Sequence, residues 1–243
     1  MNESSSLPQD VLEMLRQFDT PTICNVIELF DVRPRTSGYM DQRIKAHFPE
    51  MPPMVGYATT ATYRSSAPPQ GADVYDAMEK QLSVLKRRPG PHVIVFQDLD
   101  DPSTAATFGE VMCTSYQTFG AVGLVTSGTG RDLDQVRQIG FPVFSSGTNC
   151  SHGWCHTLNV DVPVHVGGLT VRPGDLLHGD ANGVTNIPGE IAAEVARLCP
   201  DFVAAEEVVL DCLRTHGPDL SRLQEARREC RRRVARLAER LTG

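Results

Sequence analysis

The sequence predicts an α/β protein that forms one domain with a helical tail. Strand and helix patterns alternate at short intervals through the middle of the chain, which is typical of a largely parallel sheet. After Gly147, several short strand patterns are separated by Gly-Gly, Pro-Gly-Asp and Asp-Ala-Asn-Gly turns. From Pro188 onward the apolar residues return to helical spacing.

The elements follow from local pattern. Apolar positions predict two short helices at the start, and the second has Thr20 as its capping residue and Pro21 at its first position. Residues 31–54 contain several prolines and few periodic apolar positions, which predicts a long connection. The alternating elements that come next are strands at 55–63, 92–96, 122–126 and 142–144 and helices at 72–87, 108–119 and 132–139.

No internal repeat or low-complexity linker divides the chain, so residues 1–217 are predicted to form one domain. Residues 218–243 hold eight arginines against four acids and predict a helix. Val234, Leu237 and Leu241 would give this helix one apolar face. It either belongs to the same unit or packs on a neighbouring subunit.

Composition excludes several classes of protein. The 243 residues contain 23 Lys and Arg against 30 Asp and Glu, and this net charge of −7 argues against nucleic-acid binding through bulk positive charge. No apolar run approaches the roughly 20 residues of a membrane span, and the first residues lack a signal peptide. Seven cysteines, an odd number, favour reduced thiols. We therefore expect a cytoplasmic protein with no membrane partner.

The most informative stretch runs from Thr107 to Asp132. Gly109 and Glu110 open a predicted helix, so the free amides of its first turn, backed by the helix dipole, form a site for an anion. Twenty residues separate Glu110 from Arg131, the length of one helix plus one strand. In such a βαβ unit Arg131 and Asp132 lie near the start of the helix, at the edge where α/β sheets bind ligands.

These motifs occur with others in a fixed order. G-E-x20-R-D encloses G-x-x-G-x-V at 120–125 and is followed by P-V-F at 142–144, V-x-V-G-G-x-x-V-x-P-G-D at 164–175 and D-x-x-G-V-x-x-I-P at 180–188. Over about residues 20–210 the sequence resembles the RraA-like family, which includes the class II 4-hydroxy-4-methyl-2-oxoglutarate/4-carboxy-4-hydroxy-2-oxoadipate aldolases. The resemblance implies a compact α/β/β/α sandwich of the swivelling, phosphohistidine-domain-like type. It also implies a homotrimer or homohexamer with active sites at subunit boundaries.

The resemblance also implies roles for individual residues. Glu110 holds a metal-bound water, and the backbone amides of Gly109, Glu110, Val111 and Met112 take the carboxylate of the pyruvyl group. Arg131 contacts the keto oxygen of the substrate, and Asp132 ligates Mg²⁺ or Mn²⁺. A glutamate from a neighbouring subunit is part of the site in the family's aldolases, and Glu206 or Glu207 is the candidate here.

Residue types agree with this chemistry. Cleavage of a 4-hydroxy-2-oxo acid, or decarboxylation of oxaloacetate, leaves the enolate of pyruvate, which a hard divalent cation and a fixed arginine stabilise. The other route to this enolate is a lysine Schiff base. None of Lys45, Lys80 and Lys86 lies in or after the motifs, so the metal route is favoured. We expect a metal-dependent carbon–carbon lyase acting on a pyruvate-containing oxo acid.

Two alternatives for the whole protein stay open. One is a non-catalytic protein that binds and regulates a ribonuclease. The other is a family lyase recruited to a different oxo acid. Ser127 and Gln135 stand where the family carries acids, and both changes remove negative charge near the metal.

Simpler roles also remain for single motifs. Thr107-x-x-Glu110 can form a capping box, and Asp132 can cap the next helix. Two cysteines and two histidines between Cys150 and His156 can bind zinc, or this loop, with Trp154 and His152, can select substrate. The default for His47, His165 and His178 is a surface or core role, and the turns at 173–175 and 180–183 are predicted to be structural.

Overall fold

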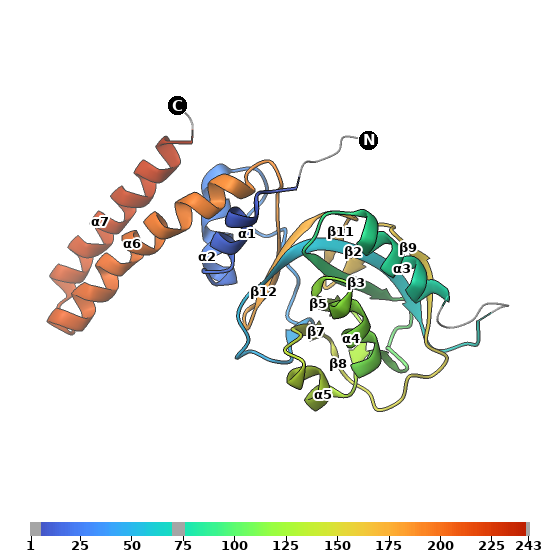
Figure 1. Cartoon of the computed structure of the whole chain (residues 1–243). Coiled ribbons are helices and arrows are strands. Elements are labelled where there is room, and N and C mark those ends of the chain that lie inside the picture. Colours follow the sequence, from blue (N-terminus) through green and yellow to red (C-terminus); the bar gives the residue numbers. More distant parts are fainter. Residues whose placement is uncertain (1–5, 70–75, 242–243) are drawn as a thin grey trace.

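The computed structural model describes residues 6–69 and 76–241, and in this part of the chain the main sheet has eight strands. Their order is β1 (Lys45–Ala46), β7 (Val143–Ser145), β5 (Ala121–Thr126), β3 (His92–Asp98), β2 (Met54–Arg64), β12 (Leu176–Asp180) and β13 (Gly183–Ile187), with β9 (His156–Val160) also paired to β2. β2, β3, β5 and β7 run parallel to one another. Their carboxyl ends therefore meet at one edge of the sheet (Figure 1).

The central strands are apolar on both faces because each face is covered. Val93 and Val95 of β3 pack in a core shared with the hairpin β10 (Val164–Val166) and β11 (Leu169–Val171). Ile94 and Phe96 pack in a core on the other face. A strand covered on both faces loses the apolar–polar alternation of a surface strand, which explains the continuous run Val-Ile-Val-Phe.

Helices lie in two groups (Figure 1). The helices α3 (Asp76–Arg87), α4 (Glu110–Thr118) and α5 (Leu133–Gln138) follow the strands of the parallel layer, and α4 buries Cys113 and Tyr116 against it. At the other end, α1 (Gln9–Leu15), α2 (Thr20–Ile27), the short 3-10 helix η1 (Glu28–Phe30) and the first half of α6 (Ala192–His216) pack beside β12 and β13. Part of the predicted helix 72–87, residues 72–75, lies outside the described residues.

A second, three-stranded parallel sheet positions the predicted site. It consists of β4 (Ala106–Phe108), β6 (Thr129–Gly130) and β8 (Gly147–Thr148), which come shortly after β3, β5 and β7 in the chain. The helix α4 begins just after β4, the Arg131-Asp132 pair follows β6, and the loop from Cys150 to His156 follows β8. Three segments far apart in sequence thus leave neighbouring strands at the same edge.

The Arg-rich tail is the second arm of a helical hairpin that projects from the body (Figure 1). α6 ends before Gly217, which has a φ of +61°, and the side chain of Asp219 caps α7 (Leu220–Glu239) by accepting from two backbone N–H groups. Leu237 is buried, and Val234 and Leu241 pack against the core formed by α1, α2 and α6 of the same chain. The apolar face of this helix is therefore covered by its own chain.

Local hydrogen bonds explain the turn at 180–183 and correct one helix cap. The N-cap of α2 is Asp19, whose carboxylate accepts from the N–H of Thr22, so the prediction of Thr20 as the cap is wrong by one position. Thr20 instead donates its backbone N–H to Asp180 and bonds the ring of buried His178 through its hydroxyl. Asp180 and His178 therefore join the turn to α2, which is a structural role.

No helix among the described residues is long and apolar enough to cross a membrane. All seven cysteines carry free thiols.

Candidate active site

A cavity of about 470 Å³ opens where β4, β6 and β8 end. Its walls come from the three segments that follow these strands. The lining residues are Ala106, Thr107, Phe108, Gly109, Val111, Met112, Arg131, Asp132, His152, Gly153, Trp154 and Cys155. The site residues predicted between Gly109 and Asp132 all line this cavity except Glu110, which lies beside it at the first position of α4.

The start of α4 holds a carboxylate of the chain itself. The backbone N–H of Glu110 donates to Oδ2 of Asp132 at 3.1 Å. Gly109 makes this approach possible, because an added Cβ at that position would lie 2.5 Å from the same oxygen. The predicted proximity of Arg131-Asp132 to the helix start is therefore confirmed, and one of the amides expected to bind an anion already has an acceptor.

Asp132 adopts an unusual backbone conformation. Its φ of +54° lies in the left-handed region, which Asp and Asn tolerate better than most residues. Asp132 occupies the N-cap position of α5, as the simpler interpretation expects, but its side chain makes no capping hydrogen bond there. The carboxylate turns to α4 and to Arg131, whose Nε lies 3.6 Å from Oδ2. In the described part of the chain its Oδ1 has no hydrogen-bond partner, and the side chain is 37% exposed.

The described residues give the side chain of Glu110 no structural role. The capping-box interpretation is wrong because Thr107 belongs to β4 and the N-cap of α4 is Gly109. The hydroxyl of Thr107 instead accepts from that of Thr126, at 3.3 Å. Glu110 is exposed, and its carboxylate has no hydrogen bond or ion pair with any residue that the structure describes. The side chain is therefore free of structural contacts beside the cavity.

Residues of the loop from Cys150 to His156 form part of the cavity wall. The rings of His152 and His156 bond the carbonyls of Gly153 and Trp154 through Nδ1, and burial raises the pKa of the Cys155 thiol. Among the described residues, no three His, Cys, Asp or Glu side chains gather where they could hold a metal. The zinc interpretation of this loop is not supported, whereas the loop does lie beside a cavity, as its alternative interpretation requires.

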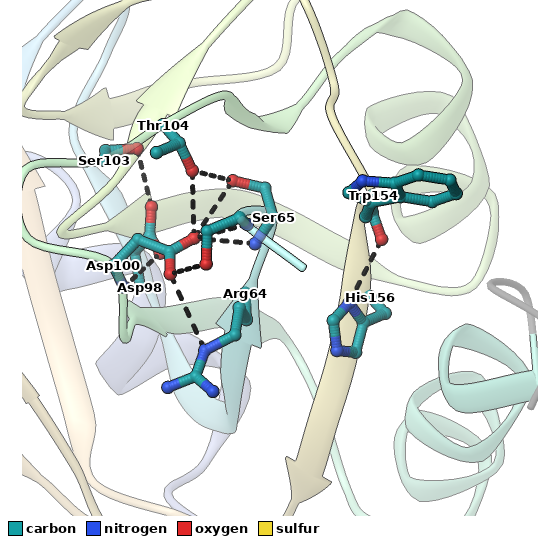
Figure 2. Close-up of polar contacts among 9 residues, drawn as sticks. Arg64, Ser65, Asp98, Asp100, Ser103, Thr104, Trp154 and His156 are labelled. Carbon is teal, nitrogen blue, oxygen red and sulfur yellow. Dashed lines mark hydrogen bonds and ion pairs between the residues drawn. The ribbon is translucent and has the colours of Figure 1, made fainter. Parts of the chain in front are cut away.

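An acidic network lies next to this loop and was not predicted from the sequence (Figure 2). Asp100 accepts hydrogen bonds from the backbone N–H groups of Ser65 and Ser66 at 2.8 and 2.9 Å and from the hydroxyls of Ser66, Thr104 and Ser65. Burial alone would raise the pKa of this carboxyl, but these donors outweigh it and hold the pKa at about 2. Asp100 therefore stays ionised and fixes the surrounding backbone.

Asp98 is the second acid of the network. It accepts from the hydroxyl of Ser103 at 2.6 Å and from the N–H of Asp100 at 3.0 Å, while burial raises its pKa. The signal in the sequence is Asp-Leu-Asp-Asp-Pro directly after a buried strand. Acids at the carboxyl end of a parallel strand lie at the functional edge of the sheet.

The remaining candidate residues lie away from the cavity. Ser127 accepts from the N–H of Asp98 at 2.9 Å, and Gln135 is exposed on α5. Glu206 lines a separate cavity between α6 and α7, and Glu207 pairs with Arg214 on α6. Any contribution of either glutamate to the site would have to come in a second copy of the chain. His47 bonds Ser145, and His165 lies on β10, so neither lines the cavity.

Comparisons with known proteins identify similar sequences and folds. A family model described as "RraA-like: Aldolase/RraA" matches residues 20–185. A protein of Halalkalibacterium halodurans named "Putative 4-hydroxy-4-methyl-2-oxoglutarate aldolase" is 36% identical over 110 residues, which cover 44% of this chain and 52% of that protein. A protein of the same name from Hahella chejuensis is 30% identical over 112 residues, 44% of this chain and 67% of that protein. The match thus spans about half the length of the first relative.

Two solved structures show the same fold. An uncharacterized protein from Pseudomonas syringae has a TM-score of 0.71 at 24% identity, over 93% of this chain and 96% of that chain. Streptomyces coelicolor RraAS2, described as "an unusual member of the RNase ES inhibitor RraA protein family", has a TM-score of 0.66 at 23% identity, over 83% and 96%. The expected α/β fold with C-terminal helices is confirmed.

Proposed function

The family model covers more than half of the residues, so the chain belongs to the RraA-like family, and on this premise we propose a divalent-metal-dependent carbon–carbon lyase. Its substrate class is the pyruvate-containing oxo acids, cleaved by retro-aldol reaction or decarboxylation. The observation that carries the proposal is the carboxylate of Asp132, held on the cavity wall at the start of α4 with Arg131 beside it.

The donor set fits a hard cation that keeps most of its water. Oδ1 of Asp132 has no partner among the described residues, and the carboxylate of Glu110 is equally free nearby. The described chain gathers no cage of three or more protein ligands, and Mg²⁺ commonly binds through one or two carboxylates plus water. Asp132 would hold Mg²⁺ or Mn²⁺, with Glu110 near its water. When bound, the cation supplies positive charge where negative charge develops on the substrate.

The start of α4 and Arg131 orient the substrate. The N–H groups of Val111 and Met112 belong to the first turn of the helix, where no intrahelical acceptor exists, so they can receive the substrate carboxylate. Arg131 follows β6 and lines the same cavity, within reach of the adjacent keto oxygen. A fixed guanidinium there stabilises the charge that forms on this oxygen when the carbon–carbon bond breaks.

Glu110 is the candidate proton carrier. In retro-aldol cleavage the C3–C4 bond breaks, its electron pair moves toward the keto oxygen, and the 4-hydroxyl loses its proton as a new carbonyl forms. A free carboxylate can accept that proton, directly or through a water, and return it to C3 to give pyruvate. In decarboxylation of oxaloacetate, carbon dioxide leaves and only the return of a proton to C3 is needed.

Assembly and location are part of the proposal. The homotrimer or homohexamer and the cytoplasmic location stay predictions, and with them a contribution of Glu206 or Glu207 to a neighbouring site. In an assembly where Glu206 or Glu207 of one subunit approaches the cavity of its neighbour, that glutamate would join Asp132 and Glu110 in the neighbour's site.

A ribonuclease regulator is the second candidate, because RraAS2, which shares the fold, is described as a member of an RNase inhibitor family. This function would need neither metal nor the free acids of the cavity. A nuclease retained by the wild-type protein and equally by Arg131→Ala would favour it.

The test is metal-dependent release of pyruvate from 4-hydroxy-4-methyl-2-oxoglutarate and from oxaloacetate, measured with lactate dehydrogenase and NADH. Enzyme-free reactions at the same Mg²⁺ or Mn²⁺ concentration are subtracted, since oxaloacetate decarboxylates slowly with metal alone. We expect activity that disappears in EDTA, returns with metal and is lost in Asp132→Ala. Asp134→Asn, an exposed acid on α5 outside the cavity, is the matched control and should keep full activity. Equal rates in EDTA would overturn the proposal.

A further inference from the structure

Two large, exposed apolar side chains lie on the wall of the cavity that is proposed to take a charged substrate. Trp154, 56% exposed, and Val111, 67% exposed, both line the cavity, as does Met112, which packs partly buried against the core beneath α4. Other large apolar side chains of this chain are also exposed, but Trp154 and Val111 lie together on the wall of one cavity. Because they lie on the wall of one cavity, a ligand in that cavity would cover them.

Trp154 is held in this position by its backbone. Its N–H donates to the carbonyl of Ser65 at 3.0 Å, and the N–H of Ala106 donates to the carbonyl of Ser151 at 2.7 Å. The amide of Asn149 donates to the carbonyl of Thr104 at 3.1 Å. Ser65 and Thr104 are both hydrogen-bonded to Asp100. The backbone is thus held at Trp154 and at two of the five residues before it, so the exposure of Trp154 does not come from a loose segment.

Gly153 shows the same close fit. Its φ is +50°, and an added Cβ would lie 2.7 Å from the carbonyl oxygen of Ser65. Only glycine satisfies both the backbone conformation and this approach without strain. The residue before Trp154 therefore serves to bring the loop against the end of β2.

The charges on the wall are few. Arg131 is the one arginine that lines the cavity in the described structure, and no lysine does. Arg64 is paired with Asp100 at 3.6 Å, and Figure 2 shows its guanidinium pointing away from Trp154. One carboxylate and the keto oxygen of an oxo acid account for Arg131 and the start of α4. A second carboxylate farther along the substrate would meet Trp154 and Val111, and the described residues of this chain place no arginine or lysine on that part of the wall to pair with it.

We propose that the preferred substrate carries an apolar or aromatic group beyond the carbon–carbon bond that is cleaved, packed against Trp154 and Val111, where the dicarboxylates of the pyruvate-release test carry their second carboxylate. This inference rests on the proposed function and ranks its substrates: 2-oxo acids with one carboxylate and an apolar end bind better than 4-hydroxy-4-methyl-2-oxoglutarate and oxaloacetate. Trp154 is then a specificity-determining residue, and Asp100 is a positioning residue that acts through the loop.

Two ligands of the same shape test the inference. 2-Oxoglutarate and 5-methyl-2-oxohexanoate share the 2-oxo acid head and chain length, and differ in a terminal carboxylate against an isopropyl group. Trp154 is the only tryptophan of the chain, so its fluorescence reports occupation of this wall directly. In Mg²⁺ or Mn²⁺ we expect the isopropyl compound to bind roughly tenfold more tightly, from burial of its apolar surface. Pyruvate, which has the head alone, should bind most weakly and change the fluorescence least.

Variants of Trp154 test the apolar part of the cavity wall while the residues proposed to bind the 2-oxo acid group stay unchanged. Isothermal titration of Trp154→Ala should show the two ligands binding within about twofold of each other, whereas Trp154→Phe keeps most of the preference. The exposure of the indole means that neither variant removes a core residue. His152→Gln tests the one other group on the wall that can become cationic, and it should leave the preference unchanged.

The outcomes are distinguishable. Equal or tighter binding of 2-oxoglutarate overturns the inference and leaves the lyase proposal intact, and loss of that binding in His152→Gln would identify the partner of the second carboxylate. If neither ligand nor pyruvate binds with metal present, the proposed function fails and the inference fails with it.

Discussion

Asp100 and Asp132 both follow strands of the parallel layers, yet their surroundings differ in the property that matters for function. Asp100 accepts five hydrogen bonds from three residues, its side chain is only 8% exposed and its pKa is about 2. Asp132 accepts one backbone hydrogen bond, is 37% exposed and sits in a left-handed conformation.

The number of hydrogen bonds that each carboxylate accepts separates an acid that stabilises the fold from one that is available to bind a ligand. A carboxylate whose lone pairs are all used stabilises the fold and has no capacity for a cation. A carboxylate held in place by one bond, with an oxygen left open on a cavity wall, is ready to bind. The comparison predicts that Asp100 affects stability and Asp132 affects activity.

The largest expected effect is that of Asp132→Asn. We expect kcat/KM to fall about a thousandfold, since a metal ion supplies several kcal/mol of transition-state stabilisation and each 1.36 kcal/mol is tenfold in rate. The melting temperature without metal should stay within about 1 °C of wild type, because the exposed side chain makes a single hydrogen bond. A large drop in the melting temperature would contradict the prediction that Asp132 affects activity and not stability.

Arg131→Gln should come next. Loss of a fixed donor at the developing oxyanion typically costs about a hundredfold in kcat. Binding of Mn²⁺, followed by electron paramagnetic resonance, should persist, because Asp132 is intact. If metal binding disappears together with activity, Arg131 positions Asp132 and does not act on the substrate.

Gly109→Ala is expected to cost about tenfold in metal affinity, a usual size for disturbing a group next to a metal ligand. The φ of −154° is open to any residue, so the backbone tolerates the change. The new Cβ would meet Oδ2 of Asp132 and displace the carboxylate. Calorimetric titration with Mn²⁺ measures the loss, and Gly120→Ala, which meets no atom within 4 Å but has a φ of +93°, separates crowding from backbone strain.

Asp100→Asn should have the smallest effect on activity, a few-fold rise in KM through a looser Trp154 loop. Its effect on stability should be larger, a loss of about 2 kcal/mol or roughly 4–8 °C in melting temperature, because buried hydrogen bonds to a charge are lost. Circular dichroism during heating measures it.

The pH dependence of that loss has a definite sign. The folded pKa of Asp100 is about 2, below the roughly 3.9 of an unfolded aspartate. Its contribution is therefore complete above pH 3.9 and is lost as the pH falls toward 2. The stability difference between wild type and Asp100→Asn should stay constant from pH 7 to about pH 5 and shrink at more acidic pH, measured at matched ionic strength. A constant difference down to pH 3 would show that the ionised carboxylate is not what stabilises the loop.

The sequence by itself determined the fold class and predicted most of the residues that the structure brings together at the candidate site. Apolar periodicity placed the alternating strands and helices, because the local pattern reflects which faces are buried. The spacing from Glu110 to Arg131 placed Asp132 at the start of α4, because a βαβ unit of that length returns to the same edge. Because no lysine lies in or after the motifs, the sequence favoured metal-dependent chemistry over a lysine Schiff base.

Tertiary structure decided what these residues contact. The extension of three strands into the small sheet, the joining of Trp154 to Ser65, the saturation of Asp100 and the packing of α7 on its own chain all depend on contacts between residues distant in sequence. Local propensity carries no information about such pairs, since each partner is compatible with many neighbours. Only the folded chain shows that one acid is fully bonded and the other is open.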